Sequence, residues 1–255
     1  MPAHTLPTVS LFKAASTVSL LTLASRITGL VRDLLMASMF GANALTDAFN
    51  VAFRIPNLFR RLFAEGAFSQ AFVPVLAASK AKAGDEATRT LISHVATLLF
   101  WVLLVTCVLG VVGAPLLVWL LASGLRQSPE GYDAAVLMTR WMFPYIGFMS
   151  LVALSAGVLN TWRRFAVSAA TPVLLNLAMI AAAFWGAPWL QARGIEPIYA
   201  MAGGVMLGGV LQLAVQLPAL ARLGLLPRIG FSPAALREAW AEAGVRRILK
   251  LMAPA

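Results

Sequence analysis

The chain has 255 residues, of which 60% are hydrophobic and 12% are charged. Soluble domains carry about 25% charged residues, so this composition excludes an ordinary soluble protein, and its long continuous apolar runs exclude a membrane β-barrel, whose strands alternate. The net charge of +10 does not indicate nucleic acid binding, because the basic residues lie in short segments between apolar runs, where they orient membrane helices.

Six complete membrane spans and the start of a seventh are predicted in an all-α polytopic protein. The six are expected at residues 11–40, 47–63, 91–121, 132–159, 167–190 and 198–220. A short amphipathic helix is expected over 234–243, and a seventh apolar segment opens near Val245 and is still open at Ala255. We therefore expect residues 1–222 to form the N-terminal lobe of a longer protein and residues 223–255 to form a linker.

The distribution of Lys and Arg predicts the orientation. With the N-terminus in the cytoplasm, the inner segments carry 14 of these residues and the outer loops carry 2. Because basic residues favour the cytoplasmic side, the N-terminus is expected inside.

Charged residues interrupt the first two spans, although a charge at the bilayer centre costs roughly 2.5–3.5 kcal/mol on insertion scales. The first span is about 45 Å long, which exceeds a hydrocarbon core of about 30 Å. Gly29, between Arg26 and Arg32, is the expected hinge within it. Pro56 is expected to interrupt the second span.

Polar residues in the second span recur at intervals of 3, 4, 3 and 4, which places them on one stripe of a helix. They are Asp47, Asn50, Arg54, Asn57 and Arg61. The pattern predicts a polar seam that faces inward and an apolar surface that faces lipid.

The first span has a weaker stripe with the same spacing. Its residues are Ser19, Thr22, Arg26, Gly29 and Asp33. Two such seams on consecutive antiparallel helices could line one aqueous cavity.

Arginines outnumber aspartates along these seams. Arg26, Arg32, Arg54 and Arg60 face only Asp33 and Asp47. The alternative that the charges simply pair and hold the bundle together stays open. A cavity with net positive charge favours an anion, and arginine forms bidentate hydrogen bonds to phosphate oxygens. A diphosphate is therefore the expected kind of ligand.

Several other features have structural interpretations. Glu65 and Gly66 are expected to end the second helix before a short interfacial helix over 67–78, with Glu65 either solvated or paired with Arg60. No catalytic set, nucleotide loop or metal-ligand spacing is present in the sequence, so neither an enzyme nor a resident cofactor is expected. Four glycines in the sixth span are expected to permit close helix packing: Gly203, Gly204, Gly208 and Gly209.

Three segments closely resemble the MurJ/MviN family of lipid II flippases. They are SRITGLVRD (25–33), FGANALTDAFNVAFRIPNLFRRLFAEGAFSQAFVP (40–74) and GVLNTWRRF (157–165). The resemblance implies about fourteen helices in two lobes around a cationic cavity. It also implies alternating access, which moves lipid-linked disaccharide-pentapeptide to the outer leaflet of the bacterial inner membrane.

The resemblance also implies residue roles. Arg26, Arg32 and Arg60 match the family's functional arginines, Asp47 matches its acidic residue, and Arg54 stands where relatives can carry lysine. It assigns conformational roles to four motif residues: Pro56, Asn57, Glu65 and Gly66.

Coupling to membrane potential or to a monovalent cation is expected to involve the second lobe, and cell-wall synthesis proteins are candidate partners besides lipid II and membrane lipids. Two alternatives remain open at this point: export of another polyprenyl-linked sugar or amphipathic drug, and a non-transporting cell-wall scaffold.

Overall fold

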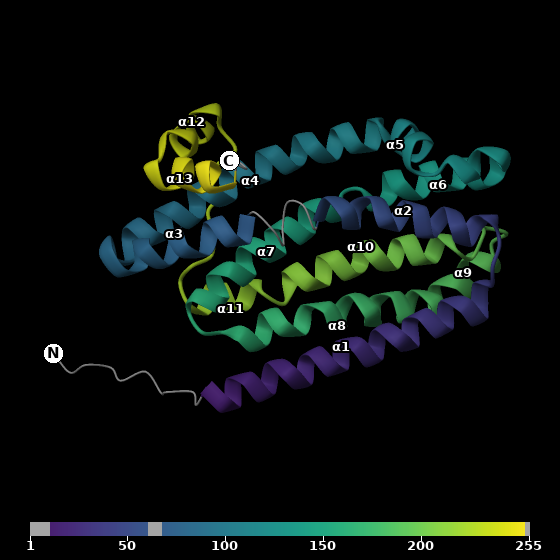
Figure 1. Cartoon of the computed structure of the whole chain (residues 1–255), viewed down its shortest axis with the longest axis horizontal. Coiled ribbons are helices and arrows are strands. Elements are labelled where there is room, and N and C mark those ends of the chain that lie inside the picture. Colours follow the sequence, from purple (N-terminus) through teal and green to yellow (C-terminus); the bar gives the residue numbers. More distant parts are fainter. Residues whose placement is uncertain (1–10, 61–67, 253–255) are drawn as a thin grey trace.

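The computed structural model describes residues 11–60 and 68–252, and within these ranges every regular element is a helix (Figure 1). The helices are α1 (Leu11–Phe40), α2 (Ala44–Arg60), α3 (Phe68–Lys82), α4 (Gly84–Val112), α5 (Ala114–Leu121), η2 (Ser123–Gln127), α6 (Pro129–Met142), α7 (Tyr145–Thr161), α8 (Phe165–Ala181), η3 (Ala182–Gly186), α9 (Ala187–Gln191), α10 (Tyr199–Ala214), α11 (Leu217–Arg222), α12 (Pro233–Ala241) and α13 (Ala243–Met252).

The long helices pack side by side as a bundle, and α1 lies at one edge of it (Figure 1). α1 packs chiefly on α8, α8 packs on α10, and α2 packs on α6, α7 and α10. The main core lies between α2, α6, α7 and α10, where Phe49, Met138, Tyr145 and Met201 are buried. This arrangement places α8 as the neighbour of α1, although 124 residues separate the end of one from the start of the other.

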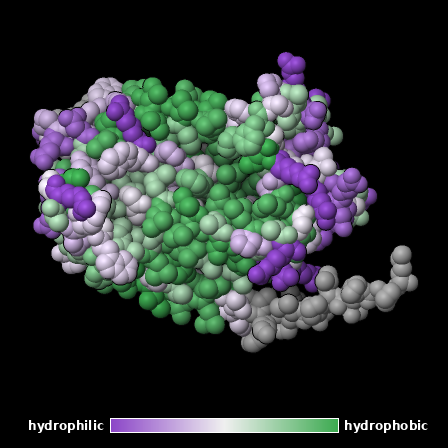
Figure 2. All heavy atoms as spheres, turned by 180° about the vertical axis from the view of Figure 1, so that it is seen from behind, coloured by the Kyte–Doolittle hydropathy of each residue, from purple (hydrophilic) through white to green (hydrophobic). Residues whose placement is uncertain are grey.

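Four stretches of the described chain are long and apolar enough to cross a membrane: Gly84–Val112, Pro129–Thr161, Phe165–Gln191 and Tyr199–Arg222. They correspond to the predicted third to sixth spans. α1 and α2, which carry the interrupting charges, are not among the helices that are long and apolar enough by this measure. Figure 2 shows one face of the molecule, on which a belt of hydrophobic residues separates the hydrophilic residues at the two ends.

The helix interruptions differ from those expected. α1 runs without a break through Gly29, with the predicted ends, and α2 continues past Pro56 to Arg60. Proline removes the hydrogen bond of its own nitrogen and crowds the preceding turn, yet α2 is assigned as helix on both sides of Pro56. The breaks lie later, at Gly113 between α4 and α5, and at Phe143–Pro144 between α6 and α7.

Three of the four glycines predicted to allow close packing do so. A Cβ on Gly204 would lie 2.7 Å from the Cβ of Ala182 and 3.1 Å from the Cα of Met179, and Gly208 and Gly209 lie similarly close to neighbouring helices. Gly203 faces open space, with nothing within 4 Å. The helix periodicity explains the difference, because Gly203 is rotated by about 100° from Gly204.

Replacing Gly204 with alanine is expected to lower stability by about 1–3 kcal/mol, because the atoms it would strike are a methyl group and backbone that cannot rotate away. Gly203→Ala is the matched control and should leave the thermal unfolding temperature unchanged or raise it slightly. Equal losses of unfolding temperature in the two variants of the purified full-length protein would contradict this packing.

The segment after α11 folds back along α4. Ser232 caps α12 by accepting a hydrogen bond from the backbone nitrogen of Ala235, and Glu242 pairs with Nδ1 of His94 on α4. The predicted amphipathic helix over 234–243 is therefore confirmed as α12, within one or two residues at each end.

The predicted start of a seventh span near Val245 coincides with α13 and stays a prediction, because the described residues end at Met252. α13 buries Val245 and Ile248 against α3 and α4. Its opposite face exposes Arg246, Arg247 and Lys250. Within the described residues α13 is therefore amphipathic.

Removing the carboxylate of Glu242 is expected to loosen the docking of α12. The side chains of His94 and Glu242 are each about one quarter exposed, so the loss should be about 1 kcal/mol or less. Glu242→Ala should therefore speed hydrogen exchange of the α12 amides severalfold, whereas Glu238→Ala, at an exposed position of the same helix, should not. Identical exchange in the two variants would show that the pair does not hold α12.

Candidate functional site

A cavity of about 620 Å³ lies where α1, α2, α5 and α8 approach one another. Arg32 of α1 and Arg54 of α2 both line it, as does Asn57. The rest of its lining is apolar: Val51, Phe53, Ile55, Leu58, Leu121 and Leu175. The fold therefore brings Arg32 of the first span to one cavity with Arg54 and Asn57 of the second stripe, even though α1 and α2 pack mainly on other helices. No residue of the predicted α1 stripe is among the described residues that line it.

Arg32 is held by two partners. Its Nε and Nη2 donate to Oδ1 of Asp33 at 2.9 and 2.8 Å, and its Nη1 donates to Oδ1 of Asn176 on α8 at 2.8 Å. The arginine side chain is 20% exposed and that of Asp33 is 63% exposed. Because the planar guanidinium is fixed on two sides, Arg32 is presented to the cavity in a defined orientation.

Asn176 is the residue that joins α1 to α8, and it was not among the residues predicted from the sequence. It is 6% exposed, and its Nδ2 donates to the backbone oxygen of Ser25 at 2.9 Å and to Oγ1 of Thr28 at 3.2 Å. Gly29 lies against it, since a Cβ there would be 3.4 Å from Nδ2. The only signal in the sequence was a lone asparagine within the apolar run of the fifth span.

Gly29 therefore has an observed packing role. Asn176 packs over Gly29 while it bonds with the backbone of Ser25, and a Cβ at Gly29 would meet it at van der Waals distance. Its predicted role as a hinge stays a prediction, because α1 is continuous at this point in the structure.

Arg54 is exposed, and it forms no ion pair or hydrogen bond with any residue in 11–60 or 68–252. Among the described residues, the cavity lining thus contains two guanidinium groups and no carboxylate, since Asp33 lies beside the cavity rather than in its wall. Such a wall attracts anions, and two guanidiniums present several N–H donors with the spacing of phosphate oxygens.

The apolar surface of α2, which was predicted to face lipid, is instead buried in the bundle. Asp47, Asn50 and Arg54 are exposed, whereas Ala48 and Ala52 are fully buried in the core. The spacing correctly identified which residues share a face. The apolar face, however, packs against α6 and its neighbours, so the polar seam lies on the open side of the bundle.

Arg26 and Asp47 lie away from this cavity. Both are exposed, and neither lines it. Asn43 caps α2 by accepting hydrogen bonds from the nitrogens of Leu45 and Thr46, and Asp47 follows in the first turn, where a carboxylate complements the helix dipole. Among the described residues Asp47 pairs with neither Arg26 nor Arg32, so charge neutralisation is observed only between Arg32 and Asp33.

Two predicted site residues cannot be placed at the cavity. α2 ends at Arg60, whose side chain lies outside the described part of the chain, and Glu65 falls in the segment 61–67, also outside it. Asn57 takes part in an interaction and lines the cavity.

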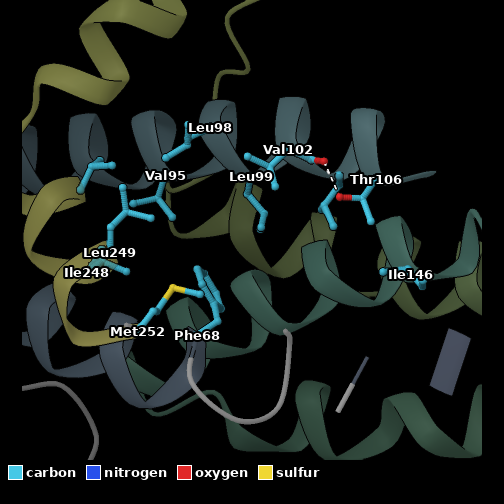
Figure 3. A pocket seen from close by; sticks show the side chains of 12 residues that line it. Phe68, Val95, Leu98, Leu99, Val102, Thr106, Ile146, Ile248, Leu249 and Met252 are labelled. Carbon is cyan, nitrogen blue, oxygen red and sulfur yellow. Dashed lines mark hydrogen bonds between the residues drawn. The ribbon is translucent and has the colours of Figure 1, made fainter. Parts of the chain in front are cut away.

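A second, smaller cavity has a different character. It has a volume of about 180 Å³ and lies between α3, α4, α7 and α13. Figure 3 shows its lining, which includes Phe68, Val95, Ile248 and Met252. The hydroxyl of Thr106 donates to the backbone of Val102 and leaves no polar group for a ligand, so this cavity belongs to the docking of α13.

Comparison with known proteins identifies the family. A family model described as "Lipid II flippase MurJ" matches residues 36–255. The chain is 52% identical over 97% of its length to the lipid II flippase MurJ of Burkholderia cenocepacia, and covers 46% of that protein. It is 42% identical over 92% of its length to the probable lipid II flippase MurJ of Haemophilus influenzae, and covers 45% of it.

A solved structure agrees with the sequence comparison. A lipid II flippase MurJ in an inward closed conformation superposes with a TM-score of 0.70 at 25% identity, over 92% of this chain and 46% of that one. The chain therefore spans about half the length of the relatives it matches. On the family match and the shared fold, this chain belongs to the MurJ lipid II flippase family.

Proposed function

We propose that this chain forms the N-terminal lobe of a transporter that moves lipid II from the inner to the outer leaflet of the bacterial inner membrane. The observation that carries the proposal is the similarity, over nearly the whole chain, to proteins named lipid II flippases. The cavity supports it, because Arg32 and Arg54 both line it and no carboxylate is among the residues of its wall that the structure describes.

In this mechanism the arginines bind the diphosphate of lipid II, which is the only strongly anionic group common to undecaprenyl-diphosphate-linked precursors. Arg32 and Arg54 line the cavity, and Arg26 and Arg60 engage the substrate as the cavity changes access. Asp47, Asn57 and Glu65 form alternative pairs during that change, and Gly29 and Pro56 accommodate the bending. The excess of arginines over aspartates favours binding of the diphosphate throughout the change of access.

The complete transporter has two lobes, and this chain supplies the first six spans, including the charged helices α1 and α2. The arrangement of the ends supports a cytoplasmic N-terminus, because α3, α11, α12 and α13 gather at the end of the bundle where α1 begins (Figure 1). These helices carry much of the basic charge, and basic residues favour the cytoplasmic side.

The energy source lies outside this lobe. Membrane potential or a monovalent cation acts through the second lobe, and movement of a lipid with a charged head group across the potential provides a direct route for coupling. Proteins of cell-wall synthesis are the expected partners.

Growth complementation tests the proposal. In cells depleted of their own flippase, the full-length gene should restore growth, whereas Arg26→Ala and Arg32→Ala should each fail at normal expression. The exposed Arg237 of α12 provides the control, and Arg237→Ala should restore growth. If both seam variants supported growth, the role of the arginines would be refuted.

A further inference from the structure

A third cavity, of about 760 Å³, lies between the beginning of α4 and the segment that leads from α11 to α12. It is separate from the cavity lined by Arg32 and Arg54, and no residue lines both. Its polar wall includes Arg89, Ser93 and His94 from α4 and Arg228 from the connecting segment. A basic cavity at this place has no role in the transport path proposed above.

The two arginines are available to a ligand. Within the described ranges, neither the Arg89 nor the Arg228 guanidinium makes an ion pair or hydrogen bond, and both residues are exposed. His94 is already paired with Glu242. Glu86 is the only carboxylate among the described residues of the wall, so the fixed charge of that lining is net positive.

The cavity wall is held in place by backbone contacts. Ser93 Oγ accepts a hydrogen bond from the nitrogen of Arg228, Thr97 Oγ1 accepts one from Gly230, and Trp101 Nε1 donates to the oxygen of Gly230. Gly224 has a φ of +66°, and a Cβ there would lie 3.1 Å from Arg89 Nη2. The glycine therefore leaves the space that the Arg89 guanidinium occupies.

The position of the cavity matches the headgroup level of a membrane. On α4 the exposed apolar residues begin at Val102, roughly 13 Å along the helix from Ser93, and Trp101 stands at the boundary, as tryptophans do at membrane interfaces. Leu226 and Phe231, on the connecting segment, are 51% and 69% exposed. A ligand here would have its phosphate beside arginines and its apolar chains beside exposed hydrophobic side chains.

We infer that this cavity binds the phosphate group of an anionic phospholipid from the leaflet on the side where α12 and α13 lie. The lipid would stabilise the docking of the connecting segment on α4, because Arg89 belongs to one element and Arg228 to the other. The inference concerns a structural lipid and does not depend on lipid II being the transported substrate.

Native mass spectrometry of the full-length protein in mild detergent tests the inference. The probes are phosphatidylglycerol and phosphatidylcholine with identical acyl chains, and inorganic phosphate. The wild type should retain one phosphatidylglycerol with about tenfold preference over phosphatidylcholine. Arg89→Gln/Arg228→Gln should lose that preference, and Arg89→Lys/Arg228→Lys should keep most of it because the charge remains.

The matched control is Arg222→Gln/Arg237→Gln, which removes two exposed charges from neighbouring elements outside the cavity wall and should bind like the wild type. An unchanged preference in the Arg89/Arg228 glutamine variant, or equal loss in the control, would overturn the inference. Equal retention of phosphatidylcholine by the wild type would also overturn it. Displacement of the lipid by millimolar inorganic phosphate would identify free phosphate as the ligand. It would overturn the inference that the ligand is a phospholipid.

Discussion

Replacing Arg32 and Arg54 together with glutamine is expected to weaken binding of lipid II to the full-length protein by about 100-fold or more. Each guanidinium can form charge-assisted hydrogen bonds to the diphosphate, worth about 1.5–3 kcal/mol, and these two are the cations among the described residues of the wall. Binding of labelled lipid II to the purified protein, measured at fixed salt, gives the ratio directly.

Lysine variants separate charge from geometry in this experiment. Arg32→Lys/Arg54→Lys keeps both charges but loses the planar fork, so its affinity should lie between those of the wild type and the glutamine variant. Arg193→Gln, which removes an arginine stacked on Trp189 outside the cavity, should bind normally. If the glutamine variant bound lipid II as tightly as the wild type, the cavity would not be the diphosphate site.

Replacing Asn176 with leucine is expected to reduce both stability and transport. The change removes the acceptor for Arg32 Nη1 and the donor for the Ser25 oxygen, and it leaves a partly buried guanidinium with Asp33 as its remaining partner. Loss of hydrogen bonds at such a site costs about 1–3 kcal/mol. Transport in reconstituted vesicles should fall by about tenfold or more.

Asparagine-to-aspartate replacement at the same position distinguishes positioning from packing. Asn176→Asp keeps the shape and the acceptor for Arg32, but it loses the donor to the Ser25 oxygen, so the unfolding temperature should fall in this variant too. The added carboxylate neutralises Arg32, so lipid II binding should still fall. If Asn176→Leu lowered stability while Asn176→Asp left binding unchanged, Asn176 would have only a packing role.

The helices of this fold could be predicted well from the sequence, because long apolar runs and their breaks are local properties. α1 has the ends that its apolar run predicts, Leu11 and Phe40. α13 shows the limit of the same argument. Three basic residues within this ten-residue helix make it amphipathic, and its apolar residues alone do not tell whether a span begins there.

The partners of each helix could not be predicted in the same way. The 3–4 spacing on α2 correctly grouped Asp47, Asn50 and Arg54, but spacing does not tell which neighbour covers the opposite face. The buried face of α2 packs against α6, far along the chain. Asn176 was missed for the same reason, since its importance comes from Arg32, which lies 144 residues away.

Cross-linking of lipid II in the membrane tests the central claim most directly. A photoreactive residue in place of Leu58, which lines the cavity and is 48% exposed, should form an adduct with radiolabelled lipid II in the full-length protein. The same residue at Val105 of α4, outside that cavity and 56% exposed, should not. The adduct at position 58 should diminish when Arg32 and Arg54 are both glutamine. Equal adducts at both positions, or an adduct only at position 105, would contradict a lipid II site between α1 and α2.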